Sequence, residues 1–174
     1  MIVVLIGYMA SGKSVIGKVL AENLNYGFID LDDFIEEKEQ KTISDIFKLN
    51  GEIRFRKLES HYLQALLSTE DNLVLSLGGG TPCYGDNMKM LLDSDQVKTV
   101  YLRASVNTLV NRLKNEKSKR PLIAHIVSED DLIEFVAKHL FERRQFYEQA
   151  EVGITTDNKS VGAISNEISE FLNQ

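Results

Sequence analysis

The stretch from Gly7 to Ser14, G-Y-M-A-S-G-K-S, constrains this chain more than any other. It has the G-x-x-x-x-G-K-[ST] spacing of a phosphate-binding loop and follows the apolar run Ile2–Ile6, which is typical of a buried parallel strand. Gly7 and Gly12 permit the backbone angles that let successive N–H groups point at a phosphate. Lys13 brings a positive charge to the outer phosphates, and the Ser14 hydroxyl is suited to Mg²⁺. The stretch therefore predicts nucleoside triphosphate binding, the alternative being a strand-to-helix turn without a ligand.

Composition narrows the class of protein. The chain has 174 residues, of which 43% are hydrophobic and 26% charged, so we expect one domain spanning 1–174. A net charge of −6 without a long basic run argues against nucleic-acid partners. No apolar run reaches the roughly eighteen residues of a membrane span. The single cysteine, Cys83, leaves no internal disulfide and no metal cluster, and we expect a cytoplasmic monomer.

Apolar strand-like runs alternate with helical patterns along the chain. This alternation predicts a parallel sheet covered by helices on both faces, an α/β fold in which ligands gather at the carboxyl ends of the strands. We expect strands at 2–6, 28–30, 73–77, 98–102 and 152–155. We expect helices at 13–25, 33–41, 44–49, 52–68, 86–92, 105–115, 129–149 and 161–172.

Two carboxylates, Asp30 and Asp32, lie at the end of the second predicted strand. On an extended backbone both side chains point to one face, where a cation or a hydrogen-bonding ligand relieves their repulsion. One suits Mg²⁺, directly or through water, and the other suits proton acceptance from an attacking hydroxyl. The alternative is a helix N-cap with acidic residues in the first turn, a role that we assign to Asp33. Beside a phosphate loop, we favour the functional interpretation for the pair.

Three consecutive glycines, Gly78, Gly79 and Gly80, follow the third predicted strand. A glycine run costs chain entropy and makes sense where a ligand approaches the backbone and binds its N–H groups. The alternative is a flexible loop, which the position at a strand's carboxyl end disfavours. Because no aspartate closes this strand, Ser76 becomes the candidate to hold a metal-bound water there.

Three arginines are candidate anion ligands. Arg56 has Glu52 and Glu59 within one helical turn, so an ordinary ion pair is the simpler interpretation of this residue alone. Arg120 precedes a proline in the one basic cluster, which suits either a mobile lid over phosphates or a solvated loop. Arg143 has no carboxylate three or four residues away, which leaves it available to grip a substrate carboxylate.

Taken together, these motifs resemble the shikimate kinase family over essentially the whole length. The resemblance implies a nucleoside monophosphate kinase-like fold: a three-layer P-loop kinase with a five-stranded parallel sheet in the order 2-3-1-4-5 and helices on both faces. It also implies acid-substrate-binding helices at about 33–62 and a lid at about 113–125. The motifs that carry it are the phosphate loop, the Asp30–Asp32 pair, the segment 51–56, the glycines 78–80, the segment 119–122 and the spacing from Arg143 to Tyr147.

The resemblance further implies transfer of the ATP γ-phosphate to the 3-hydroxyl of shikimate, in aromatic amino acid biosynthesis. By that match Asp32 is the base or orienter of the hydroxyl, and Lys13 and Arg120 neutralise the moving phosphoryl group. Asp30 and Ser14 position Mg²⁺, Asp30 through water. The carboxylate of shikimate is held by Arg56 and Arg143, with Gly78, Gly79 and Gly80 against the ring hydroxyls.

The nucleotide side of the site is also implied by the resemblance. Arg112 stacks on adenine, and the loop around Asn158 closes the base site. The expected ATP-binding residues are Ala10, Ser11, Gly12, Lys13, Ser14, Val15, Arg112, Arg120 and Asn158.

Three positions depart from the family pattern. Ala10 replaces a common glycine, which is tolerable if its backbone angle is ordinary. Val15 stands where threonine is usual, so one hydroxyl contact to the α-phosphate is lost. Gln145 replaces a frequent proline. None of these changes touches the expected chemistry.

Two other functions remain as alternatives. One is another small-molecule kinase of this fold, such as a gluconate kinase, which fits the two arginines and the triple glycine less well. The other is a nucleotide-binding regulatory module without turnover. Such modules usually lose the lysine or the acidic pair, whereas this chain keeps Lys13, Asp30 and Asp32.

Overall fold

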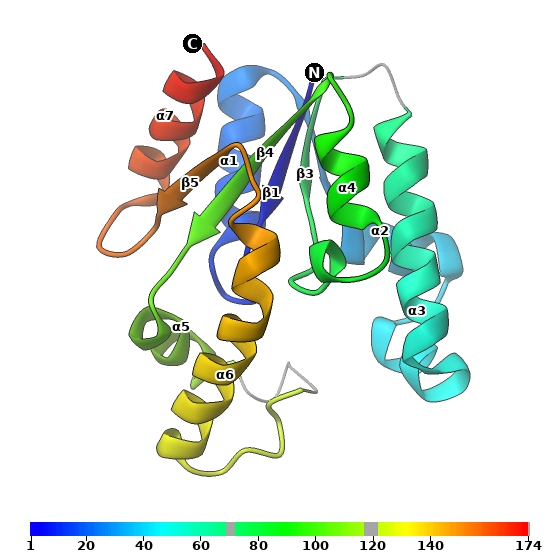
Figure 1. Ribbon diagram of the computed structural model, residues 1–174, viewed down its shortest axis with the longest axis vertical. Coiled ribbons are helices and arrows are strands. Elements are labelled where there is room, and N and C mark those ends of the chain that lie inside the picture. Colours follow the sequence, from blue (N-terminus) through cyan, green and yellow to red (C-terminus); the bar gives the residue numbers. More distant parts are fainter. Residues whose placement is uncertain (69–71, 117–121, 174) are drawn as a thin grey trace.

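The computed structural model describes residues 1–68, 72–116 and 122–173. Five strands form one parallel sheet in the order β2-β3-β1-β4-β5 (Figure 1). The predicted strand order and the parallel direction are therefore confirmed. The strands are β1 (Ile2–Ile6), β2 (Gly27–Asp30), β3 (Leu73–Ser76), β4 (Val97–Arg103) and β5 (Val152–Thr155).

Helices cover both faces of the sheet, which gives the predicted three layers (Figure 1). Helices α1 (Lys13–Leu24) and α7 (Val161–Leu172) share one hydrophobic cluster with one face. The remaining helices contribute to the larger cluster on the other face. They are α2 (Leu31–Glu39), α3 (Ile43–Leu67), α4 (Asn87–Leu92), α5 (Val106–Leu113) and α6 (Glu129–Tyr147).

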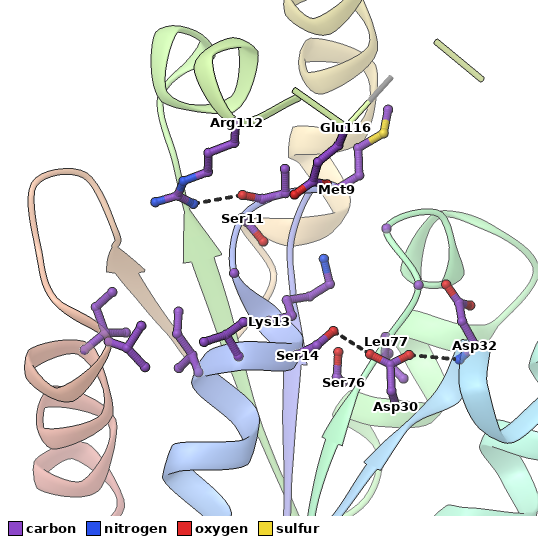
Figure 2. A pocket seen from close by; sticks show the side chains of 18 of the residues that line it. Met9, Ser11, Lys13, Ser14, Asp30, Asp32, Ser76, Leu77, Arg112 and Glu116 are labelled. Atoms are coloured by element: carbon purple, nitrogen blue, oxygen red, sulfur yellow. Dashed lines mark hydrogen bonds between the residues drawn. The ribbon is translucent and has the colours of Figure 1, made fainter. Parts of the chain in front are cut away.

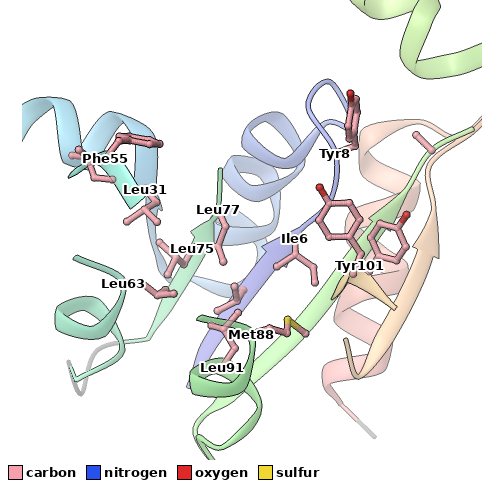
Figure 3. Close-up of a cluster of buried hydrophobic side chains, with 14 of the residues drawn as sticks. Ile6, Tyr8, Leu31, Phe55, Leu63, Leu75, Leu77, Met88, Leu91 and Tyr101 are labelled. Carbon is pink, nitrogen blue, oxygen red and sulfur yellow. The ribbon is translucent and has the colours of Figure 1, made fainter. Parts of the chain in front are cut away.

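The central strand β1 shows how the two clusters divide the core. Ile2, Val4 and Ile6 face the larger cluster, whereas Val3 and Leu5 face the smaller one, as the two-residue period of a strand requires. Figure 3 shows Ile6 among the side chains of the larger cluster. All five side chains are completely buried. Each contributes about 1.5–3 kcal/mol by leaving water. This burial fixes the carboxyl end of β1, and with it the start of the phosphate loop.

Helix α2 begins earlier than the sequence predicted, at Leu31. Asp30 is its N-cap, and its Oδ1 accepts a hydrogen bond from the backbone N–H of Asp32 at 3.1 Å. Asp32 therefore lies in the first turn of a helix, and the expectation of an extended backbone there was wrong. The capping role expected of Asp33 belongs to Asp30, because a cap carboxylate satisfies a free N–H at the helix start.

Helix α3 spans the two helices predicted at 44–49 and 52–68, with a kink at Gly51. Gly51 has φ 77° and ψ 171°, a backbone conformation outside the helical region that glycine adopts without a Cβ clash. The predicted interruption is thus present as a kink. A short 3₁₀ helix after the glycine run, η1 (Thr81–Cys83), was not predicted. No helix among the described residues combines the length and apolarity needed to cross a membrane.

Candidate active site

A cleft of about 660 Å³ opens at the carboxyl ends of β1, β2 and β3 (Figure 2). The phosphate loop forms one wall, through residues 9–16. Asp30, Asp32 and residues 76–79 form the facing side, and Arg112 lies at the rim beside the loop. The position agrees with the general rule that ligands bind outside the carboxyl ends of parallel strands.

The phosphate loop has the curled backbone that its glycines predict. Gly7 has φ 146° and Gly12 has φ 100°. A Cβ on Gly7 would lie 2.7 Å from the carbonyl oxygen of Leu102, so this position also lacks room for a side chain. The Nζ of Lys13 donates to the carbonyls of Gly7 and Tyr8 at 2.8 and 2.9 Å. The ammonium is thereby held inside the loop, where a phosphate competes for it.

Ala10 contradicts the expectation of an ordinary backbone angle, because its φ is 62°. A left-handed conformation costs a residue with a Cβ roughly 1–2 kcal/mol relative to glycine. The carbonyl of Ala10 accepts a hydrogen bond from Nη1 of Arg112 at 2.8 Å. The hydrogen bond that joins helix α5 to the phosphate loop is thus accepted by the strained residue, Ala10.

Three oxygen-bearing side chains lie together beneath the loop. The Ser14 hydroxyl donates to Oδ2 of Asp30 at 2.6 Å. The Oγ of Ser76 is buried and has no hydrogen-bond partner among the described residues. Within that part of the chain, no three His, Cys, Asp or Glu side chains gather as a metal cage. The donors fit Mg²⁺, which takes one or two protein oxygens and fills its remaining positions with water and phosphate.

The Asp32 carboxyl group lies across the cleft from the phosphate loop and has a raised pKa. Its Oδ1 is inaccessible to solvent and has no hydrogen-bond partner among the described residues. Burial, with the nearby charges of Asp30 and Glu59, raises the pKa of Asp32 to about 7, against the opposing effect of Lys13 and Arg56. Such a carboxyl group is half-ionised near neutral pH, which suits a general base.

The two arginines that were predicted to bind an acid, Arg56 and Arg143, lie close to the backbone of the glycine run. A Cβ on Gly80 would stand 2.8 Å from Nη1 of Arg56, and one on Gly79 would stand 3.6 Å from Nη1 of Arg143. Arg143 is 9% exposed. The hydroxyl of Tyr147, one turn further along α6, donates to the carbonyl of Gly79 at 2.5 Å. Both guanidinium groups therefore lie beside the glycine run, although only Gly78 and Gly79 line the cleft, and Gly80, Arg56 and Arg143 do not.

Comparison with known proteins decides the family. The family model for shikimate kinase matches residues 9–173. The chain belongs to the shikimate kinase family. It is 46% identical to the shikimate kinase of Flavobacterium psychrophilum over 170 residues, which cover 98% of both chains. The shikimate kinase of Flavobacterium johnsoniae is 44% identical with the same coverage.

Solved structures of the shikimate kinase family have the same fold. The shikimate kinase of Bacteroides thetaiotaomicron superposes with a TM-score of 0.91 at 35% identity, over 100% of this chain and 99% of that one. The Acinetobacter baumannii enzyme in complex with shikimate gives 0.86 at 29% identity, over 99% and 92%. A gluconokinase from Sinorhizobium meliloti gives 0.56 at 19% identity, over 98% and 94%, which shows a shared fold alone.

Some residues expected from the shikimate kinase pattern are not brought into the cleft. Arg120 and part of the predicted lid at 113–125 lie outside the described residues. Asn158, with φ 58°, is not among the lining residues, although Lys159 and Val161 of the same segment are. Val15, in contrast, does line the cleft, with 59% of its surface exposed.

Sequence reasoning missed what surrounds the two arginines of this shikimate kinase site. Arg56 does pair with Glu52 and Glu59, as the helical spacing predicted. Glu59, however, is 1% exposed and also accepts a hydrogen bond from the Thr81 hydroxyl at 2.5 Å. A buried carboxylate needs such partners, but no local pattern indicates that Glu59 lies on a buried face of α3.

A second missed contact joins the phosphate loop to helix α6. The hydroxyl of Tyr8 lies 3.0 Å from Nδ1 of His139, one turn before Arg143. Burial lowers the pKa of His139 to about 4, with Arg143 adding to the effect. The imidazole is therefore neutral at physiological pH. The two residues lie 131 positions apart, and no local pattern links them.

Proposed function

We propose that this protein transfers the γ-phosphoryl group of ATP to the 3-hydroxyl of shikimate, giving shikimate 3-phosphate and ADP. The observation that carries the proposal is the cleft, in which the phosphate loop meets the Asp32 carboxyl group in a member of the shikimate kinase family. The acceptor oxygen attacks phosphorus, the bond to the ADP oxygen breaks, and the hydroxyl proton leaves to a base.

We assign Asp32 as that base or orienter. Its pKa of about 7 allows it to take the proton near neutral pH and to release it again after turnover. Lys13 and Arg120 are assigned to the charge that spreads over the moving phosphoryl oxygens. The Nζ of Lys13, which donates to the carbonyls of Gly7 and Tyr8, lies inside the loop that is proposed to hold the phosphates.

Mg²⁺ is assigned to Ser14 and Asp30, with Asp30 acting through water. The 2.6 Å hydrogen bond between these two side chains and the unpartnered Oγ of Ser76 support this assignment. When bound there, the ion would supply positive charge that offsets the charge of the phosphates. Ser76 is assigned to a water of its coordination shell.

The acid substrate is assigned to the glycine end of the cleft. Arg56 and Arg143 bind its carboxylate, and Gly78, Gly79 and Gly80 lie against its ring hydroxyls. Guanidinium groups grip carboxylates through paired N–H donors, which fixes orientation as well as affinity. The approach of both arginines to the glycine run supports the assignment, since a side chain on Gly80 would collide with Arg56, and a Cβ on Gly79 would already be in van der Waals contact with Arg143.

The nucleotide is assigned to the loop side of the cleft. Residues 10–15 hold the phosphates, Arg112 stacks on adenine, and the segment containing Asn158 closes over the base. The hydrogen bond from Arg112 to Ala10 holds Arg112 beside the loop, which supports its assignment. Lys159 and Val161 line the cleft, which supports the assignment of the segment that contains Asn158.

We further propose a single kinase domain over 1–174, with acid-binding helices at 33–62 and a lid at 113–125, acting as a cytoplasmic monomer without nucleic-acid or membrane partners.

ADP release in the presence of Mg²⁺ and ATP tests the proposal. We expect turnover that depends strictly on shikimate and is not supported by gluconate, the acceptor of the alternative small-molecule kinase. Release of ADP with gluconate but not shikimate would reassign the acceptor. ATP binding without turnover on either acid would favour a regulatory module.

A further inference from the structure

Arg56 divides its N–H groups between two carboxylates of its own helix. Its Nη1 donates to Oε2 of Glu59 at 2.6 Å. Its Nε and Nη2 both donate to Oε1 of Glu52, at 3.3 and 3.2 Å. The edge of the guanidinium that binds carboxylates bidentately is therefore already occupied, by a carboxylate that belongs to the protein.

The two carboxylates are held very differently. Glu59 is 1% exposed and has a second partner in the Thr81 hydroxyl, so it is fixed in the interior. The Glu52 side chain is 52% exposed and stands directly after the kink at Gly51. An ion pair at this helical spacing shifts an equilibrium by about twofold when it is exposed, and here the Glu52 carboxylate is exposed although the Arg56 side chain is only 16% exposed. Glu52 is thus the partner that leaves readily.

Tyr84 completes the surroundings of the Glu52 carboxylate. The Tyr84 hydroxyl donates to the same Oε1 atom at 3.1 Å. The Tyr84 ring stacks on the Arg56 guanidinium, whose Cζ lies 4.0 Å from the ring centroid. Three donors, two from Arg56 and one from Tyr84, therefore converge on a single carboxylate oxygen. The Arg56 guanidinium also lies against the Gly80 backbone, so this donor set stands next to the glycine run, of which Gly78 and Gly79 line the cleft.

We propose that Glu52 is a built-in stand-in for the carboxylate of the acid substrate, which displaces it from Arg56 when the substrate binds. The inference rests on the proposed function, because only there does Arg56 bind an acid. The substrate carboxylate gains Arg143 as well, whereas Glu52 engages Arg56 and Tyr84 alone among the described residues, and this difference drives the exchange. Glu52 keeps the Arg56 guanidinium oriented in the empty site and weakens binding of every acid that must replace it.

Replacing the charge of Glu52 tests the exchange. In Glu52→Gln the stand-in is neutral, and we expect the Kd and the KM for shikimate to fall about two- to fivefold, with the KM for ATP unchanged. Shikimate methyl ester, which lacks the carboxylate, is expected to bind both proteins equally. Calorimetry gives the Kd directly, since the chain has no tryptophan to report binding.

Glu148→Gln is the matched control. Glu148 has the same i,i+4 spacing from an arginine, Arg144 at 2.6 Å, with both side chains exposed, and its replacement changes the net charge equally. It should leave the Kd for shikimate unchanged. A Kd for shikimate that is unchanged or raised in Glu52→Gln would overturn the inference, as would an equal gain for the methyl ester. Absence of shikimate binding by the wild-type protein would instead overturn the proposed function itself.

Discussion

At the scale of single residues, Asp32 carries both the proposed chemistry and a cost to stability. We expect Asp32→Asn to remove most turnover while leaving the Kd for ATP nearly intact, because the amide cannot accept the hydroxyl proton and the loop is untouched. Steady-state kinetics and ATP titration measure the two effects. Normal turnover by this variant would remove Asp32 from the chemistry.

The same variant has a predicted effect on stability with a defined sign. Because the folded protein raises the pKa of Asp32 from 3.8 to about 7, the unfolded chain binds fewer protons between these pH values, and the free energy of unfolding falls as pH rises through this window. Asp32→Asn removes this fall in the free energy of unfolding. The variant should be more stable than the wild-type protein at pH 8 by on the order of 2–4 kcal/mol, with little difference near pH 4. Denaturation at both pH values measures the difference, with the exposed Asp95→Asn as the control. An equal effect of Asp32→Asn at both pH values would contradict the assignment.

Ala10 is a second residue at which local conformation sets an expectation. At φ 62° its Cβ is strained, so Ala10→Gly should raise the free energy of unfolding by on the order of 0.5 kcal/mol, the relief of strain exceeding the greater freedom of glycine in the unfolded chain. Ala137→Gly inside helix α6 is the control and should lower it by about 0.5–1 kcal/mol. Destabilisation by both changes would show that Ala10 is not strained.

At the scale of elements, helix α6 presents two adjacent arginines with different surroundings. Arg143 is buried against the glycine run, whereas Arg144 is exposed and paired with Glu148. Arg143→Ala should raise the KM for shikimate about tenfold or more and the KM for ATP little, since a lost charged hydrogen bond is worth about 1.5–3 kcal/mol. Arg144→Ala should change neither KM. Equal weakening of both substrates by Arg143→Ala would contradict the carboxylate role.

Elements also show where prediction from sequence succeeds. The strands of buried β-branched residues and the amphipathic helices follow from local periodicity, and all five strands lie where they were expected to within two residues. The start of α2 was misplaced because Asp30 both ends a strand and caps a helix, and only the backbone geometry shows which role governs Asp32. The turn η1 follows glycines that carry no periodic signal.

At the scale of the whole molecule, the site is assembled from segments far apart in the sequence. The phosphate loop could be located from the sequence because its motif lies within eight consecutive residues, although the left-handed backbone of Ala10 was not predicted. The Tyr8–His139 contact and the burial of Glu59 could not, because both depend on how α6 and α3 pack beside the sheet. Local motifs such as the phosphate loop can therefore be predicted from sequence, whereas contacts between distant segments cannot.

In the proposed reaction, the γ-phosphoryl group of ATP moves to the 3-oxygen of shikimate. The most direct test is phosphorus and proton NMR of the product formed from shikimate and γ-labelled ATP. We predict one labelled phosphate per ADP, bonded to the 3-oxygen, with coupling to the proton on that carbon. Label found as free phosphate, or on another oxygen of the ring, would contradict the account.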